Sequence, residues 1–417
     1  MQRLFFFAAL LLLGSPAAAA EEWQKLRLVA HVHTTMSTGS LSFAEVMDQA
    51  KAAQLDGVLF TDSLLRHWEY GIWPLRGLIK KVIEQPSILK AGAENYLGDI
   101  RSQNKAGGPL AVAGLEAAPF YYWRRSPFDA QGGEIRDWNQ HLLVFGLDAP
   151  EAFEQLPVND FDPYHGDYQG KPYQQFIDAA TAAGGVVFWA HPFIKHEGRH
   201  GGINDSTEAY PHLLEITNGY DGFAITYFGY LDALEPGLLW DSLLLDYVHG
   251  KRSKPVWVIG ESDWRSAQER SLAMVVTDVW VDERSPKAVV SALREGRSWA
   301  SIRADSTAPE LEAFTIVDEA SGHTAISGNH MTVHGKISIR VALRRGANAQ
   351  SKFKVTLVKN GAVLHEEELT ENKFIRKWTD QAPSAVSFYR LNVEDVSGVI
   401  YTNPIFIRPS EKLKPLR

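Results

Sequence analysis

The chain has 417 residues, 45% of them hydrophobic, and a formal net charge of −8. A chain of this length and apolar content can bury the core of a large domain and of a smaller one. Its negative charge is dispersed and no block of lysine or arginine occurs, which argues against nucleic acid or an anionic membrane as a partner. There is no cysteine, which excludes disulfides and a lipid-modified N-terminal cysteine.

Residues 1–20, MQRLFFFAALLLLGSPAAAA, have the features of a secretory signal peptide. A basic residue precedes an apolar stretch, and small residues follow it up to an expected cleavage point near Ala20. The apolar stretch is too short to span a bilayer comfortably. We therefore expect an exported protein, periplasmic or secreted, without a membrane anchor.

Between residues 25 and 303, short apolar runs alternate with helical stretches such as 42–55 and 171–183. This alternation is the pattern of an α/β domain with a largely parallel sheet. The predicted strands are 26–32, 57–62, 108–116, 141–146, 184–191, 212–217 and 255–261. About seven strands indicate a closed or nearly closed barrel.

From residue 309 to 408 the pattern changes to alternating apolar and polar residues. Two hairpins are predicted, one around Asn360-Gly361, the stronger turn signal, and one around Ser397-Gly398. This segment is expected to form a small C-terminal antiparallel β-sandwich.

Metal-binding types of side chain fall at the ends of the predicted strands. His31 and His33 share one face at the end of the first strand, a spacing that suits one metal ion, although two such histidines can also satisfy loop carbonyls. Further residues of this kind follow later strands: Asp62, Glu116, His191 and Asp263. In α/β barrels the carboxyl ends of the strands meet at one mouth. His141 precedes its strand, so it shares the mouth only if 141–146 runs antiparallel to its neighbours.

Six motifs along 26–265 resemble those of the PHP (polymerase and histidinol phosphatase) metallohydrolases. They are HVH, TDS, GLE, HLLVFG, AHP and GESDWR. The resemblance implies a distorted seven-stranded (β/α) barrel. More weakly, LREGRSWAS and the terminal YTNPIFI resemble the carbaryl-hydrolase-like branch of that family.

The resemblance also implies a ligand set for two divalent ions. One ion would be held by His31, His33, Glu116 and Asp263, and Glu116 would bridge to a second held by His141 and His191. Two such ions activate water and leave a net positive charge that favours an anionic substrate such as a phosphoester. Zinc, manganese and iron suit these ligands equally. Asp62 would orient a liganding histidine or accept a proton.

Three positions depart from the family pattern. Where many members hold a third ion, this chain has Thr38, Ser63 and Arg265. We therefore expect two ions. Arg265 either clamps an anionic group of the substrate or pairs with Glu261 or Asp263.

Two aromatic, arginine-containing segments, 66–77 and 119–125, follow the second and third strands. Their aromatic side chains either recognise the substrate or anchor the loops. His67 is placed to contact substrate, while His196 and His200 are interpreted as solvated or hydrogen-bonding histidines.

The prediction is thus an exported two-metal hydrolase, acting on a small anionic substrate and most simply a phosphoesterase. One alternative is an esterase or amidase that acts on carbamate-like substrates. Another is a catalytically silent, metal-dependent binding protein whose sandwich tethers it to a carbohydrate or a protein, which retention of all six ligands argues against.

Overall fold

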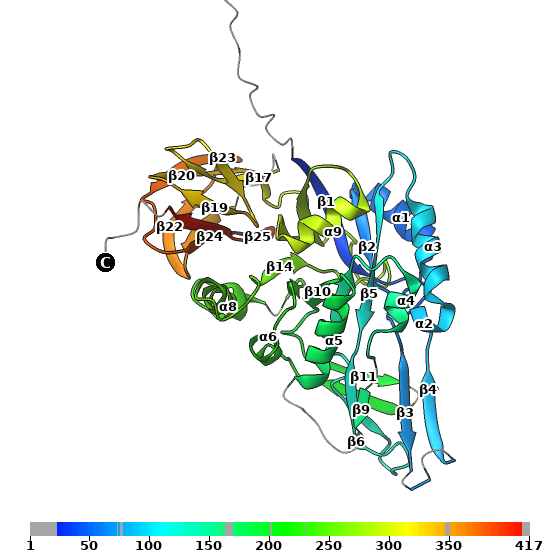
Figure 1. The fold of residues 1–417 in the computed structure, drawn as a ribbon. Helices are drawn as coiled ribbons and strands as arrows, with labels where there is room; N and C mark the ends of the chain where they lie inside the picture. Colours follow the sequence, from blue (N-terminus) through cyan, green and yellow to red (C-terminus); the bar gives the residue numbers. More distant parts are fainter. Residues whose placement is uncertain are drawn as a thin grey trace, which may run out of the picture.

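The computed structural model describes residues 23–410 except 73, 76, 77, 159, 163–169, 201, 229 and 347–350. The predicted signal peptide, residues 1–20, lies outside the described residues. Figure 1 shows a central curled sheet, with the C-terminal strands on one side and an extension of hairpins at the lower end. Within the described ranges, no helix is both long and apolar enough to cross a bilayer.

The main sheet contains a run of seven neighbouring strands, and the predicted metal ligands lie in these strands or in the loops next to them. In spatial order they are β14 (Trp257–Gly260), β13 (Gly222–Ile225), β10 (Val186–Trp189), β8 (Leu142–Phe145), β5 (Leu110–Ala117), β2 (Gly57–Phe60) and β1 (Gln24–Val32). Neighbours are parallel, except that β8 is antiparallel to both β5 and β10. The prediction that 141–146 runs against its neighbours is therefore confirmed.

The run curls until its two end strands approach each other. His33 N donates to Trp264 O and Trp264 N donates to His31 O, each at 2.9 Å, which makes an isolated parallel bridge between Val32 and Trp264. On its other edge β1 continues the sheet through β15 (Val275–Val281) and β16 (Ser298–Arg303). A mixed α/β fold with a curled sheet is confirmed, and a closed seven-stranded barrel stays a prediction.

The predicted strand at 212–217 is wrong. Residues His212–Ile216 form the short helix α6, and β13 takes the expected place in the sheet. The run HLLEI fits either element, because a short apolar run does not separate a strand from one helical turn. In β13, by contrast, glycine is required at 222, since a Cβ there would lie 2.2 Å from the carbonyl oxygen of Trp257 in β14.

Helices lie between the strands along the chain and pack against the main sheet. The other helices are α1 (Phe43–Ala52), α2 (Ile88–Ala91), α3 (Ala93–Gln103), α4 (Pro150–Glu154), α5 (Lys171–Ala182), α7 (Leu231–Leu234), α8 (Leu239–Val248) and α9 (Pro286–Arg294). The helices predicted within 42–55 and 171–183 are confirmed as α1 and α5. A capping box between Ser42 and Glu45 starts α1, whose apolar face is buried.

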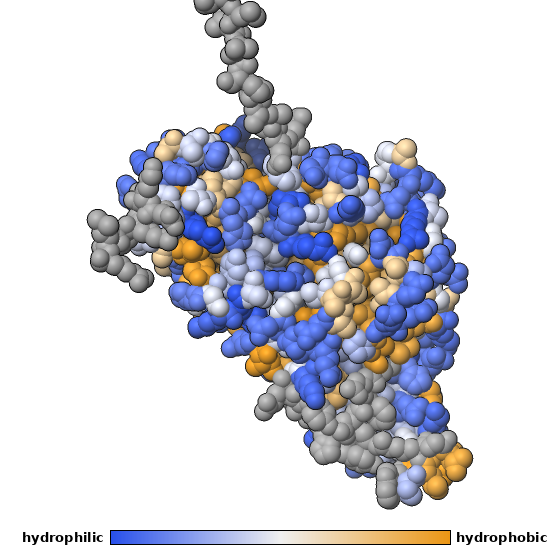
Figure 2. Space-filling model, in the orientation of Figure 1, coloured by the Kyte–Doolittle hydropathy of each residue, from blue (hydrophilic) through white to orange (hydrophobic). Residues whose placement is uncertain are grey.

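An extension grows from the loops that follow the strands of the main sheet. It consists of the hairpin β3 (His67–Gly71)–β4 (Lys80–Glu84) and a sheet in the order β11 (His196–His200), β12 (Ile203–Thr207), β7 (Glu134–Arg136), β6 (Phe120–Arg125) and β9 (Asp160–Asp162). Trp68, Tyr121 and Trp123 are buried in a small core of this extension together with Trp138. These aromatic residues of 66–77 and 119–125 therefore anchor the loops. Figure 2 shows an apolar patch at the tip of the extension, and Leu78, which precedes β4, is exposed.

The C-terminal strands form two sheets around a second core. One has the order β18 (Thr324–Ile326), β17 (Glu310–Asp318), β20 (Ile337–Arg344) and β23 (Lys373–Asp380). The other continues the main sheet from β16 through β25 (Gly398–Thr402), β24 (Ser387–Asp395), β21 (Phe353–Lys359) and β22 (Ala362–Leu369), with β26 (Ile405–Pro409) and β19 (His330–Val333) beside it. Both predicted hairpins are confirmed. Because β16 pairs with β25, the sheet is continuous with the N-terminal part, and a separate sandwich domain stays a prediction.

Candidate metal centre

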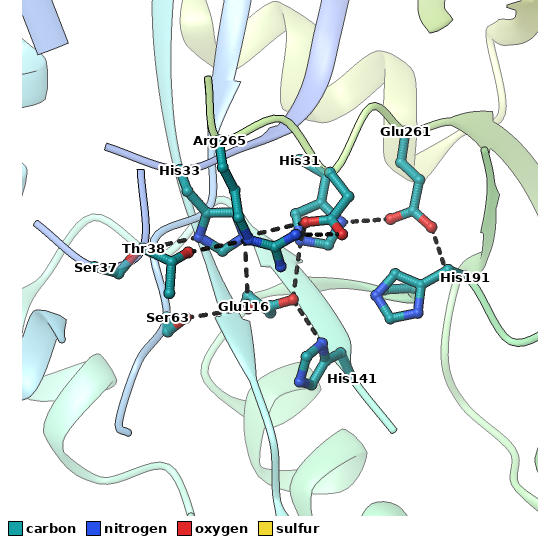
Figure 3. Close-up of polar contacts among 12 residues, drawn as sticks. His31, His33, Ser37, Thr38, Ser63, Glu116, His141, His191, Glu261 and Arg265 are labelled. Atoms are coloured by element: carbon teal, nitrogen blue, oxygen red, sulfur yellow. Dashed lines mark hydrogen bonds and ion pairs between the residues drawn. The ribbon is translucent and has the colours of Figure 1, made fainter. Parts of the chain in front are cut away.

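All six predicted ligands converge where the strands of the curled sheet end (Figure 3). They fall into two groups that share Glu116, and within each group the ligand atoms lie within 4.8 Å of one another. The groups are His31, His33, Glu116 and Asp263, and Glu116, His141 and His191. These are the two sets that the motif resemblance implies. Asp263 and His191 are the two partly exposed residues of the six, and the side chain of Asp263 is 22% exposed.

Glu116 lies at the centre of the cluster. Its Oε1 is 2.9 Å from His31 Nε2 and 2.6 Å from His141 Nδ1, and its Oε2 is 3.6 Å from His33 Nε2. Asp263 Oδ1 faces both His31 Nε2 and His33 Nε2 at 3.5 Å. Because Oε1 faces a histidine of each group, Glu116 is placed where a bridging ligand would lie.

The backbone at three of these residues is strained. His31, His191 and Asp263 have φ values of 62°, 31° and 42°. A side chain in this region costs about 1–3 kcal/mol, and such residues cluster at functional sites, where the surrounding structure holds them in place. The cluster is therefore built at the expense of local backbone stability.

The residues present fit a divalent cation. His33 Nε2 and Asp263 Oδ1 are buried and have no hydrogen-bond partner among the described residues, so both are free to coordinate. Burial lowers the pKa of His33 and holds its imidazole in the neutral, metal-binding form. Burial also opposes a charge on His31, but Asp263, Glu116 and Glu261 outweigh it and raise its pKa to about 10. Carboxylates that strongly favour a proton on His31 would favour a metal ion in the same place.

Glu261, which the sequence analysis considered only as a partner of Arg265, supports two of the ligands. Its Oε2 lies 2.6 Å from His31 Nδ1, and its Oε1 accepts a hydrogen bond from the backbone N of His191. A carboxylate on the Nδ1 side fixes the ring so that Nε2 faces the cluster. Its place two residues before Asp263 was the available signal.

Tyr210 was also missed. Its hydroxyl donates to Ala190 O, accepts from His141 N at 3.2 Å and lies 3.3 Å from His191 Nδ1. It thereby ties together the two histidines of the second group. No motif marks this tyrosine, because its role depends on the meeting of segments distant in sequence.

Asp62 holds the loop that carries His33. It accepts hydrogen bonds from Thr34 N at 2.8 Å and from Ser37 Oγ at 2.6 Å. Ser37 Oγ in turn lies 3.1 Å from His33 Nδ1. Of the two roles considered for Asp62, these contacts match orientation of a histidine, exerted through Ser37.

The three positions at which we expect no third ion make hydrogen bonds within the protein. Arg265 donates from Nη1 to Asp263 Oδ2 at 2.9 Å and from Nε to Thr38 Oγ1 at 3.3 Å, and Ser63 Oγ donates to Glu116 Oε2 at 3.1 Å. The pairing of Arg265 with Asp263 that was weighed as an alternative is thus present. The substrate clamp stays a prediction, and among the described residues no hydrogen-bond acceptor faces Nη2.

The other histidines of the mouth lie apart from the two groups. His67 begins β3, and its Nε2 is 4.0 Å from Glu69. His196 Nε2 and His200 Nε2 lie 3.6 and 3.7 Å from Asp205 Oδ2, which is longer than a hydrogen bond. Their interpretation as solvated or hydrogen-bonding histidines stays a prediction. A substrate contact by His67 stays a prediction.

No family model matches the sequence, and no curated protein matches it. Among solved structures, the chain is similar to a two-domain protein from Bacteroides vulgatus ATCC 8482, described as containing a predicted PHP-like metal-dependent phosphoesterase. The identity is 14% and the TM-score 0.40, over 92% of this chain and 95% of that chain. It is also similar to a protein from Bifidobacterium adolescentis ATCC 15703, described as a candidate metal-dependent phosphoesterase, at 15% identity and a TM-score of 0.31, over 57% and 87% of the two chains.

Proposed function

We propose that this protein is an exported metal-dependent hydrolase that holds two divalent ions and cleaves phosphoesters of small molecules. The observation that carries the proposal is the pair of ligand groups joined at Glu116, with buried ligand atoms left without hydrogen-bond partners. Both groups combine imidazole and carboxylate, which suits zinc, manganese or iron.

In this proposal His31, His33 and Asp263 complete the first metal site with Glu116, and His141 and His191 complete the second. Two divalent ions at such a site lower the pKa of a bound water and stabilise charge on the attacking and leaving oxygens. The chain's own residues set the geometry: Glu261 contacts the imidazole of His31, Tyr210 contacts that of His191, and Asp62 acts as a positioning residue through Ser37.

The substrate class follows from the charges that border the cluster. Arg265 carries a fixed positive charge beside Asp263, and one edge of its guanidinium remains for an anionic oxygen. A phosphoester supplies such oxygens, whereas a neutral carbamate or carboxylic ester does not.

The proposal is tested by metal analysis joined to a hydrolysis screen. The purified chain is reconstituted with zinc, manganese or iron, its bound metal is counted, and aryl phosphates, nucleotides, phosphodiesters and aryl carbamates are offered. We expect two ions per chain and cleavage of a phosphoester. Glu116→Gln should weaken both ions and abolish turnover while the fold survives, and Glu215→Gln, an exposed glutamate of α6, serves as the matched control.

Either of two results would contradict it. A chain that binds no ion after reconstitution would remove the metal centre, and cleavage confined to carbamates would leave the centre but replace the substrate class. Retention of both ions and of near-normal turnover in Glu116→Gln would remove Glu116 from the bridge.

A further inference from the structure

Arg66 lies on the loop between β2 and β3, next to the metal cluster. Two contacts fasten this loop to Glu116: Leu64 N donates to Glu116 O at 2.7 Å, and Ser63 Oγ donates to Glu116 Oε2 at 3.1 Å. Arg66 follows two residues later and is 8% exposed. A nearly buried positive charge is therefore placed beside the central carboxylate.

The side chain of Arg66 is held by one edge only. Its Nε donates to Gln85 Oε1 at 2.7 Å, and its guanidinium carbon lies 6.0 Å from the ring centre of Trp68. Among the described residues, no acceptor is found for Nη1 or Nη2. Neither nitrogen is completely buried, so each keeps some surface exposed to solvent.

This arrangement sets Arg66 apart from the comparably buried arginines of the described chain. The other four, Arg252, Arg297, Arg345 and Arg390, each direct at least one terminal nitrogen to a protein oxygen. Burying an arginine without an anionic partner is strongly unfavourable. An anion from outside the protein can supply the partner that the terminal nitrogens of Arg66 lack.

Charged residues of the metal cluster act on Arg66. The guanidinium of Arg66 is attracted by the carboxylates of Glu116, Asp205 and Asp263 and is repelled by Arg265. Two guanidinium groups that repel each other beside a cation site are both stabilised when an oxyanion lies between them.

We propose that Arg66 forms an oxyanion subsite beside the metal cluster, in which its two terminal nitrogens hold an anionic group of the substrate. The inference rests on the proposed function and adds to it a specificity-determining residue that contacts substrate. Its ligand is a phosphate group, either the group that reacts or a second one on the same molecule.

The test uses the full, metal-loaded chain and inorganic phosphate as the probe. Calorimetric titration compares the wild type with Arg66→Met, Arg66→Lys and Gln85→Met, with the metal content of each preparation measured. Arg66→Met should weaken phosphate binding about 10- to 100-fold, the range expected for a charged hydrogen-bonding pair. Arg66→Lys, which keeps the charge but loses the fork, should lie between. Gln85→Met, which removes only the tether at Nε, should change binding less than about threefold.

Kinetics with paired substrates provides the second arm. If Arg66 holds the reacting group, kcat/KM of Arg66→Met for p-nitrophenyl phosphate should fall about 10- to 100-fold, while that for neutral p-nitrophenyl acetate should change little. If Arg66 holds a second phosphate, the same fall should appear only with a bisphosphate. A bisphosphate substrate then locates the contact. Equal losses on mono- and bisphosphates mean that Arg66 holds the reacting group, and a loss confined to bisphosphates means that it holds the second one.

The inference and the proposed function fail in different ways. Unchanged phosphate binding in a folded, metal-loaded Arg66→Met would overturn the subsite, and so would losses on the monophosphate and the bisphosphate that are no larger than the loss on the acetate. Phosphate binding that depends on Arg66 in a chain that cleaves no phosphoester would support the subsite and refute the proposed activity. If Arg66→Met does not fold, Arg66→Lys decides, and wild-type affinity in that variant would overturn the role of the guanidinium fork.

Discussion

The carboxylate of Glu261 lies 2.6 Å from His31 Nδ1, on the side of the ring that faces away from Glu116. Both side chains are fully buried. A buried carboxylate behind a metal-binding histidine raises the basicity of the ligand and fixes its tautomer. Glu261 also accepts a hydrogen bond from the backbone of His191, so one side chain positions a member of each ligand group.

Glu261→Gln should therefore lower metal affinity without unfolding the protein. The amide oxygen of glutamine can accept only one of the two hydrogen bonds. Its NH2 group then faces either the His31 ring or the backbone N–H of His191, and that contact is lost. We expect affinity to fall about 10- to 100-fold, measured by competition with a chromogenic chelator. Glu215→Gln is again the control, and unchanged affinity would show that the ligands do not need this support.

The expected number of metal ions follows from Thr38, Ser63 and Arg265. Two neutral hydroxyls and one guanidinium offer a third cation poor ligands and repulsion. Plasma emission analysis should find two tightly bound ions in the wild type. The triple variant Thr38→Asp, Ser63→His, Arg265→His restores the ligand types of a third site, and we expect a third ion to bind. Three ions in the wild type would contradict the reading of these positions.

The contact between Arg390 and Asp241 should be important for stability. Arg390 Nε and Nη2 donate to the two carboxylate oxygens at 2.7 and 2.8 Å, and both side chains are fully buried. This pair joins β24 to α8. Asp241→Asn leaves a buried guanidinium without its anion and should lower the free energy of unfolding by about 3–5 kcal/mol, as measured in urea.

A double variant separates charge from packing in that test. Arg390→Met with Asp241→Leu removes both charges, so its loss should be smaller than that of Asp241→Asn. A loss below about 1 kcal/mol in Asp241→Asn would be typical of an exposed ion pair and would contradict the buried one described here.

Glu310 makes the junction between β1 and β17 sensitive to acid. Partial burial opposes its charge, but Arg27, Arg303 and Arg344 outweigh this effect and lower its pKa below the ordinary 4.5. A carboxyl whose pKa is lower when folded stabilises the protein above pH 4.5, and that contribution disappears as the pH falls through the folded value. Glu310→Gln should be less stable than the wild type at pH 7.

The difference in free energy of unfolding between the wild type and Glu310→Gln should shrink below pH 4.5. It should vanish once Glu310 is protonated in the folded state. Urea unfolding at a series of pH values measures it. A difference that stays constant from pH 7 into acid would mean that the variant acts through packing or hydrogen bonding rather than through charge.

Several parts of this protein could be predicted from the amino-acid order. His31, His33, Glu116, His191 and Asp263 stand at or just after strand ends, and carboxyl ends of parallel strands meet at one edge of a sheet, so their convergence follows from local pattern. The orientation of β8 followed from the position of His141. The hairpin at Asn360-Gly361 followed from the turn chemistry.

Other features were decided only by the tertiary structure. The run 212–217 is helical rather than extended because its place in the sheet is taken by β13, a competition that no short apolar run reveals. The aromatic side chains Trp68 and Trp123 became anchors because the extension closes around them.

The supporting residues Glu261, Tyr210 and Arg66 belong to this second class as well. Their roles depend on which atoms lie within hydrogen-bonding distance of a histidine, or on which nitrogens are left without an acceptor. Such distances join segments far apart along the chain, as between Arg66 and Gln85 or Tyr210 and His141. Local periodicity places a side chain on a face of a strand, but the partner across the site is set only when the strands and loops pack together.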